Sequence, residues 1–140
     1  LSALPTDHYL NVGMVGMHGN YGPNVLTNKC DLLIAVGMRF DDRVTGNLNT
    51  YAKQAKIIHL EIDPAEIDKN VKCDIALLGD VKSTLPKLTK LVNYNTHDKW
   101  LKTLTNPSTA VINDAPQIRR RLKNFLDTGA FSQKKQDGDN

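Results

Sequence analysis

The chain has 140 residues, of which 40% are hydrophobic and 24% charged, and this suits one globular domain with its own core. Its best apolar run, residues 32–36, is far shorter than the roughly 18 residues of a membrane span, and no secretory signal opens the sequence. The net charge of +3 comes from residues 97–140, where a basic cluster on a predicted helix indicates a solvated face and no nucleic-acid partner. Cys30 and Cys73 lack metal-site spacing and are expected to be reduced thiols of a cytoplasmic protein.

Glycine recurs at every third position of the segment "NVGMVGMHGNYGPN", residues 11–24. Residues 11–17 are expected to form a strand, with a weaker pattern than the strands that follow. Because glycine costs backbone entropy in a regular element, its repetition indicates sharp turns or a close approach to a flat partner.

Three further strands are predicted over residues 31–37, 56–63 and 74–80, as continuous apolar runs typical of a parallel sheet that is covered on both faces. A helix is expected after Asp63, with Pro64 at its first position and Glu66 completing a capping box. Another is expected over residues 81–94, with Pro86 in its first turn. Strands that alternate with helices predict an α/β fold, an open parallel sheet flanked by helices.

The pattern weakens after residue 96. Trp100, Leu101 and Leu104 could dock one more helix, and another is expected over residues 116–126. The predicted organisation is therefore an α/β domain over residues 1–96, a helical linker or divergent segment over 97–131, and a disordered polar tail over 132–140.

Ligands of open parallel sheets bind outside the carboxyl ends of the strands. Acids there can accept ribose hydroxyls, and an arginine or free loop N–H groups can bind a pyrophosphate. The sequence therefore predicts a nucleotide site at one edge of the sheet. The residues that would gather there are Met17, His18, Gly37, Arg39, Asp41, Asp42, Arg43, Glu61 and Asp80.

Each of these residue types also has a plainer interpretation. Methionines are commonly core filler, and a single loop histidine such as His18 is commonly only hydrogen-bonded. Residues 41–43 could be an exposed ion-pair loop, and Asp80 could cap the helix that follows it.

Four segments carry a family resemblance: "GMVGMHGNYGPN", "DLLIAVGMRFDDRVTGNL", "AKIIHLEIDPAEIDKN" and "LLGDVKSTL". In this order and spacing, over about residues 3–92, the chain closely resembles the large, catalytic subunits of acetolactate synthase (acetohydroxyacid synthase). These are thiamine-diphosphate transferases of branched-chain amino-acid biosynthesis, which join two 2-oxo acids with release of CO2. The resemblance implies a fragment of their central, Rossmann-like, FAD-holding domain, without its first strand–helix units.

The resemblance also implies a set of site residues. FAD would have a largely structural role, with Glu61 as the expected ribose partner, and Met17, His18, Asp42 and Arg43 match positions near the family's inhibitor channel. The residues that would hold FAD are Val15, Gly16, Met17, His18, Gly37, Met38, Arg39, Phe40, Asp41, Glu61, Ile62, Asp80 and Val81.

No catalytic residue and no metal ligand is expected in this chain, and the Asp-Gly-Asp of residues 137–139 lacks the downstream segment of a metal motif. Thiamine diphosphate and magnesium would bind elsewhere in the intact enzyme. Its partners would be the remaining domains, further copies in a dimer or tetramer, and a small regulatory subunit. Alone, the chain is expected to be inactive and to bind FAD weakly or not at all. The alternatives are a stand-alone nucleotide-binding or regulatory module without catalysis, or a structural piece that self-associates through an exposed sheet edge.

Overall fold

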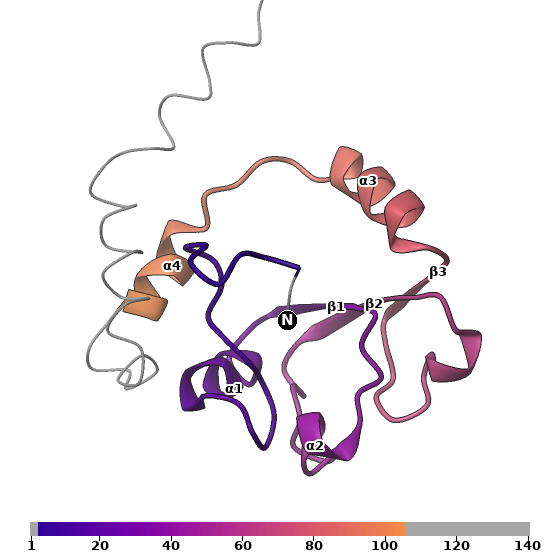
Figure 1. Ribbon diagram of the computed structural model, residues 1–140, viewed down its shortest axis with the longest axis horizontal. Coiled ribbons are helices and arrows are strands. Elements are labelled where there is room, and N and C mark those ends of the chain that lie inside the picture. The colour runs from indigo at the N-terminus through magenta and orange to yellow at the C-terminus, as the bar shows by residue number, and fades with distance from the viewer. Residues whose placement is uncertain (1–2, 106–140) are drawn as a thin grey trace, which may run out of the picture.

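A computed structural model describes residues 3–105 of the chain (Figure 1). Its centre is a parallel sheet with the strand order β1–β2–β3, formed by Leu32–Val36, Lys56–Glu61 and Ile75–Leu78. β1 pairs with β2 from Leu32↔Lys56 to Val36↔Leu60, and β2 pairs with β3 from Ile58↔Ile75 to Glu61↔Leu78. The three apolar runs thus form the predicted strands, and the α/β fold with an open parallel sheet is confirmed.

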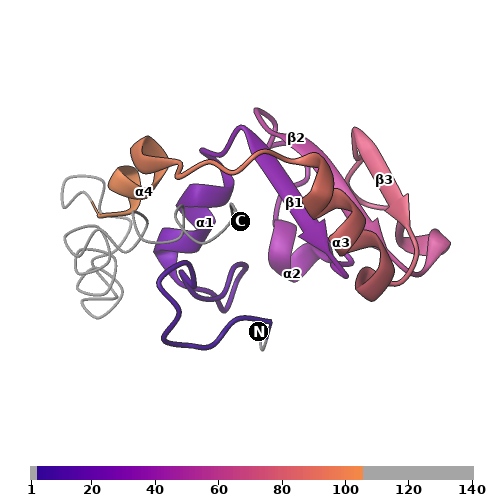
Figure 2. The ribbon, with the colours of Figure 1, turned by 90° about the horizontal axis from the view of Figure 1, so that it is seen from above.

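Helices flank this sheet on both sides, with α3 on one side and α1 and α2 on the other (Figures 1 and 2). None of the helices within residues 3–105 is long and apolar enough to cross a membrane. The helices are α1 (Tyr21–Thr27), α2 (Asp42–Thr45), α3 (Val81–Leu91) and α4 (Asp98–Thr105), with a single 3-10 turn, η1, at Pro64–Glu66.

Two apolar clusters hold these elements together. Phe40, which is 2% exposed, packs against Tyr51 and the inner residues Ala35 and Ile57 of the sheet. A second cluster joins Leu26 of α1 to Leu101 of α4, so the helix predicted near residue 100 does dock, far along the chain from its partner. The helix predicted over residues 116–126 and the tail over 132–140 lie outside the described residues.

The prediction of a strand over residues 11–17 is wrong, because this segment is irregular. Gly13 and Gly16 have φ of 102° and 96°, which interrupts an extended chain. The backbone is held by single contacts instead of a ladder, among them the Met17 N–H donating to the Arg43 carbonyl at 2.6 Å.

The predicted helix starts are partly correct. Asp63 does cap, its carboxylate accepting from the Ala65 N–H at 2.9 Å, but only the turn η1 forms. The capping box is absent because Glu66 pairs with Lys69 at 2.8 Å instead. Pro86 lies inside α3 and not in its first turn.

Candidate functional site

The carboxyl ends of the three strands meet at one edge of the sheet. The Gly37 N–H donates to the Leu60 carbonyl at 2.8 Å, and the Gly79 N–H donates to the Glu61 carbonyl at 2.9 Å. The loops that follow the strands therefore start side by side, as the parallel sheet predicts.

The loop after β1, residues 37–41, carries the exposed Arg39 next to the buried Phe40. Gly37 and Phe40 both have positive φ, 60° and 53°. This turns the Phe40 ring into the core while the Arg39 side chain remains 71% exposed, 3.6 Å from the Asp41 carboxylate. A Cβ built at Gly37 would meet no atom of the described residues within 4 Å, so none of them prevents a close approach to the backbone there.

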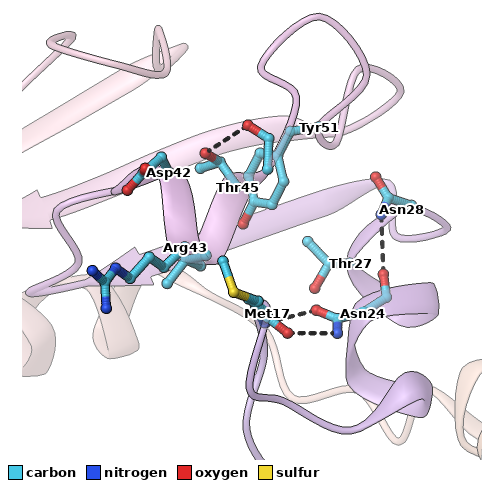
Figure 3. A pocket seen from close by; sticks show the side chains of 11 residues that line it. Met17, Asn24, Thr27, Asn28, Asp42, Arg43, Thr45 and Tyr51 are labelled. Carbon is cyan, nitrogen blue, oxygen red and sulfur yellow. Dashed lines mark hydrogen bonds between the residues drawn. The ribbon is translucent and has the colours of Figure 1, made fainter.

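The segment 15–18 lies against the first turn of α2. The Asn24 amide makes two hydrogen bonds to Gly16, accepting from its N–H at 2.7 Å and donating to its carbonyl at 3.0 Å (Figure 3). A Cβ at Gly16 would lie 2.6 Å from the Arg43 carbonyl oxygen. The close partner that requires glycine here is the chain's own backbone. Met17 is left 71% exposed, and His18 is exposed beside it.

A cavity of about 340 Å³ opens between α1 and α2 (Figure 3). Met17, Asp42 and Arg43 of the expected inhibitor-channel set line it, whereas His18 does not. Tyr51 lies on its wall, and burial together with the nearby Cys30 raises the pKa of its phenol to about 12. A tyrosine phenol is protonated at neutral pH even at its ordinary pKa of about 10, so Tyr51 can donate a hydrogen bond into the cavity.

The acids at the strand ends are occupied by their own loops. Asp41 accepts from the Val44 N–H at 3.1 Å and Asp80 from the Lys82 N–H at 2.8 Å, so each caps the following helix. Glu61, 7% exposed, accepts from the Ile62 N–H at 2.9 Å. The plainer interpretation of Asp80 as a helix cap is thus confirmed, and Asp41 and Glu61 have comparable structural contacts.

The remaining predicted contacts also lie along this edge. Ile62 has a 67% exposed side chain, while Val15, Met38 and Val81 are half-buried. Within residues 3–105, no three His, Cys, Asp or Glu side chains lie close enough together to hold a metal ion.

Sequence reasoning did not identify the side chains that support these loops. Asn24 and Asn70 hydrogen-bond to loop backbone, and His59 contacts the Met38 carbonyl from within β2. Only His59 gave a signal, because it is a polar ring between the apolar residues Ile57, Ile58 and Leu60 of β2. Asn24 lies eight positions from its partner Gly16 and Asn70 lies 30 positions from Phe40, and neither spacing is a recognised hydrogen-bonding pattern.

The family model for the thiamine pyrophosphate enzyme central domain matches residues 1–88, and the chain belongs to this family. Within it, the chain is similar to large subunits of acetolactate synthase. It is 52% identical over 101 residues to the probable large subunit of Methanocaldococcus jannaschii, which covers 70% of this chain and 17% of that protein. It is 56% identical over 82 residues to the large subunit of Parasynechococcus marenigrum, covering 59% of this chain and 13% of that protein.

A third relative is the isozyme 2 large subunit of acetolactate synthase from Escherichia coli, 50% identical over 93 residues, covering 66% of this chain and 17% of that protein. The chain therefore spans less than a fifth of the length of each of these relatives. The resemblance found in the four sequence segments is confirmed.

Proposed function

We propose that this chain acts as part of the central domain of an acetolactate synthase large subunit and holds FAD along the carboxyl edge of its sheet. The observation that carries this proposal is the pair of exposed side chains at that edge, Arg39 after β1 and Met17 beside the cavity. Both lie in the segments that resemble the family's FAD contacts.

The residues present fit a dinucleotide of this kind. The Arg39 guanidinium can make paired, charge-assisted hydrogen bonds to a pyrophosphate. The thioether of Met17 suits the face of a flat ring, and the open backbone at Gly37 allows close approach. We infer that Met17, His18, Gly37 and Arg39 contact FAD directly.

The other residues of the predicted set act mainly through the loops they shape. Glu61 and Asp80 already bind backbone N–H groups, and Phe40 faces the core. Glu61 keeps lone pairs with which it could still accept a ribose hydroxyl. Ile62 is exposed enough to cover the ligand.

The activity of the intact enzyme would depend on groups outside this chain. Thiamine diphosphate, held with magnesium by those other parts, would supply the carbanion chemistry for joining the unit left when one 2-oxo acid loses CO2 to a second 2-oxo acid. This chain would contribute the flavin-holding edge, and Asp42, Arg43 and Met17 would line the approach through the cavity. Its partners would be the remaining domains, further copies of the subunit and a small regulatory subunit, in the cytoplasm.

The test is a titration of the ¹⁵N-labelled 140-residue chain with FAD, followed by amide chemical shifts that also detect weak binding. Saturable shifts are expected at Met17, Gly37 and Arg39. None is expected at Lys56, which lies at the opposite, amino end of the strands. Arg39→Ala should weaken binding by about tenfold or more, the value of one charge-assisted hydrogen-bonding group.

Lys53→Ala is the matched control, since Lys53 is an exposed cation that belongs neither to the predicted FAD contacts nor to the lining of the cavity. Shifts that never saturate at millimolar FAD, or that gather away from the carboxyl edge, would overturn the proposed site. Tight binding by this chain alone would instead favour a stand-alone nucleotide-binding module.

A further inference from the structure

The loop that carries Arg39 is held through its backbone carbonyls by side chains from two other segments. Nε2 of His59 lies 2.8 Å from the Met38 carbonyl oxygen. The Asn70 amide donates to the Phe40 carbonyl at 3.1 Å. The Met38 carbonyl belongs to the peptide group just before Arg39, and the Phe40 carbonyl belongs to the Phe40–Asp41 peptide, so the backbone is held on both sides of the exposed cation.

The His59 contact has a defined direction. A carbonyl oxygen only accepts, so Nε2 must carry the proton and donate. The ring is fully buried, edge-on to Phe40 at 5.0 Å, and its Nε2 also lies 3.8 Å from a carboxylate oxygen of Glu61. Its Nδ1 has no hydrogen-bond partner among the described residues. Leaving Nδ1 unpaired costs free energy, so packing alone would be served better by an apolar side chain.

The loop needs such support because its conformation is unfavourable in isolation. Phe40 has a φ of 53°, a region that bulky residues rarely adopt. If the two carbonyl contacts were lost, the backbone around Arg39 could relax to ordinary angles, and the guanidinium would no longer project from a fixed point.

We propose that His59, assisted by Asn70, is a positioning residue that holds the backbone of Met38 and Phe40 so that Arg39 projects from the carboxyl edge of the sheet. The ligand that Arg39 would meet rests on the proposed function. The positioning of the loop itself rests only on these contacts.

The test compares two substitutions that differ in one donor. His59→Gln can keep an N–H donor near the Nε2 position, whereas His59→Leu fills the space without one. We expect trypsin to cleave after Arg39 mainly when the backbone of the loop opens locally, so that the cleavage rate at this bond reports the equilibrium between the held and the open loop. Mass spectrometry separates this cut from all others.

We expect His59→Leu to raise the cleavage rate at Arg39 by about 3–10-fold, the equivalent of one hydrogen bond, and His59→Gln to restore a rate near that of the wild type. The melting temperature should fall little in His59→Leu, because the variant also removes the unpaired Nδ1. If His59 only stabilised the fold as a whole, the melting temperature and the cleavage rate at Arg39 would change in parallel in the two variants. Equal cleavage rates in the Leu and Gln variants would overturn the proposal.

Two further measurements keep the proposal testable if His59→Leu does not fold. Asn70→Ala, at a more exposed site, should raise the cleavage rate about 2–5-fold, for a partly exposed hydrogen bond. Asn49→Ala, at an exposed asparagine of the 47–51 turn, should leave it unchanged. In the wild type, imidazole ¹⁵N shifts should show the Nε2–H tautomer of His59, and an Nδ1–H tautomer would contradict the assigned contact.

The FAD titration separates this inference from the proposed function. If the wild type binds FAD, His59→Leu should weaken binding while His59→Gln retains it. If the wild type does not bind FAD, the proposed function fails, and the cleavage rates and the tautomer still decide whether His59 positions the loop.

Discussion

At Gly16 the backbone approaches α2 too closely for any side chain, since a Cβ would lie 2.6 Å from the Arg43 carbonyl oxygen. Gly46 also has a positive φ, 58°, but a Cβ there would meet no atom within 4 Å in the part of the chain that the structure describes. The two positions therefore separate the cost of an unfavourable backbone angle from the cost of a clash.

We expect Gly16→Ala to lower the free energy of unfolding by about 1–3 kcal/mol more than Gly46→Ala, because only the first adds overpacking to backbone strain. Urea denaturation of the two variants measures this difference. Equal losses would mean that the segment 15–18 moves away from α2 at little cost.

At this scale the sequence indicated that glycine mattered between residues 11 and 24, but not what its partner was. The Arg43 carbonyl that excludes a side chain at Gly16 is 27 positions away, and no local pattern encodes that contact. Phe40 is the second example. Its place in a site motif indicated a ligand contact, whereas a positive φ turns its ring into the core, and phenylalanine carries no signal for that angle.

The strands and helices show which sequence patterns are sufficient by themselves to predict an element. β1, β2 and β3 were predictable because continuous apolar runs are compatible with few alternatives in a chain of this composition. The segment 11–17 has apolar residues too, yet no strand forms, since a strand also needs a hydrogen-bonded neighbour. The helix cap at Asp63 was predictable. The backbone becomes extended at Ile67 and has a φ of 58° at Asp68, so the helix does not continue and only η1 forms.

Substitution of Asp80 can show whether an acidic residue at the end of a strand caps the following helix or contacts a ligand. Its carboxylate caps α3, a helix without a single buried side chain, so the effect of losing the cap should stay local. We expect Asp80→Ala to destabilise α3 by about 0.5–2 kcal/mol, seen as faster amide exchange in that helix with little change in melting temperature.

Asp80→Ser is the control, because a serine hydroxyl also caps and should restore the slow exchange. If FAD binds Asp80→Ser as it binds the wild type, the residue acts through α3. Loss of FAD binding in the serine variant, with α3 intact, would place Asp80 in direct contact with the ligand.

For the whole molecule, an α/β fold and a site at the carboxyl edge of the sheet followed from the order of the elements. The packing of α4 on α1 did not, because Leu26 and Leu101 belong to segments with no shared pattern. The predicted domain boundary at residue 96 assigns α1 and α4 to different units. Amphipathic spacing identifies a helix that docks, but not the surface that receives it.

One outer surface of the sheet remains apolar. Leu32, Ile34 and Val36 alternate along β1 on one face, each about 45% exposed. Among the described residues, β1 is also an edge strand, hydrogen-bonded to β2 alone. An unpaired edge next to exposed apolar side chains is a template for pairing with another chain.

The isolated chain should therefore self-associate as its concentration rises, and sedimentation velocity measures this directly. Ile34→Lys places a charge in the middle of the exposed strand face. It should weaken association by about tenfold, because the burial of one aliphatic side chain contributes about 1.5 kcal/mol or more. Leu48→Lys is the matched control, since Leu48 is 41% exposed in the turn that follows α2 and lies outside the sheet. A wild-type chain that stays monomeric at high concentration, or a Leu48→Lys effect equal to that of Ile34→Lys, would show that the face of β1 does not drive association.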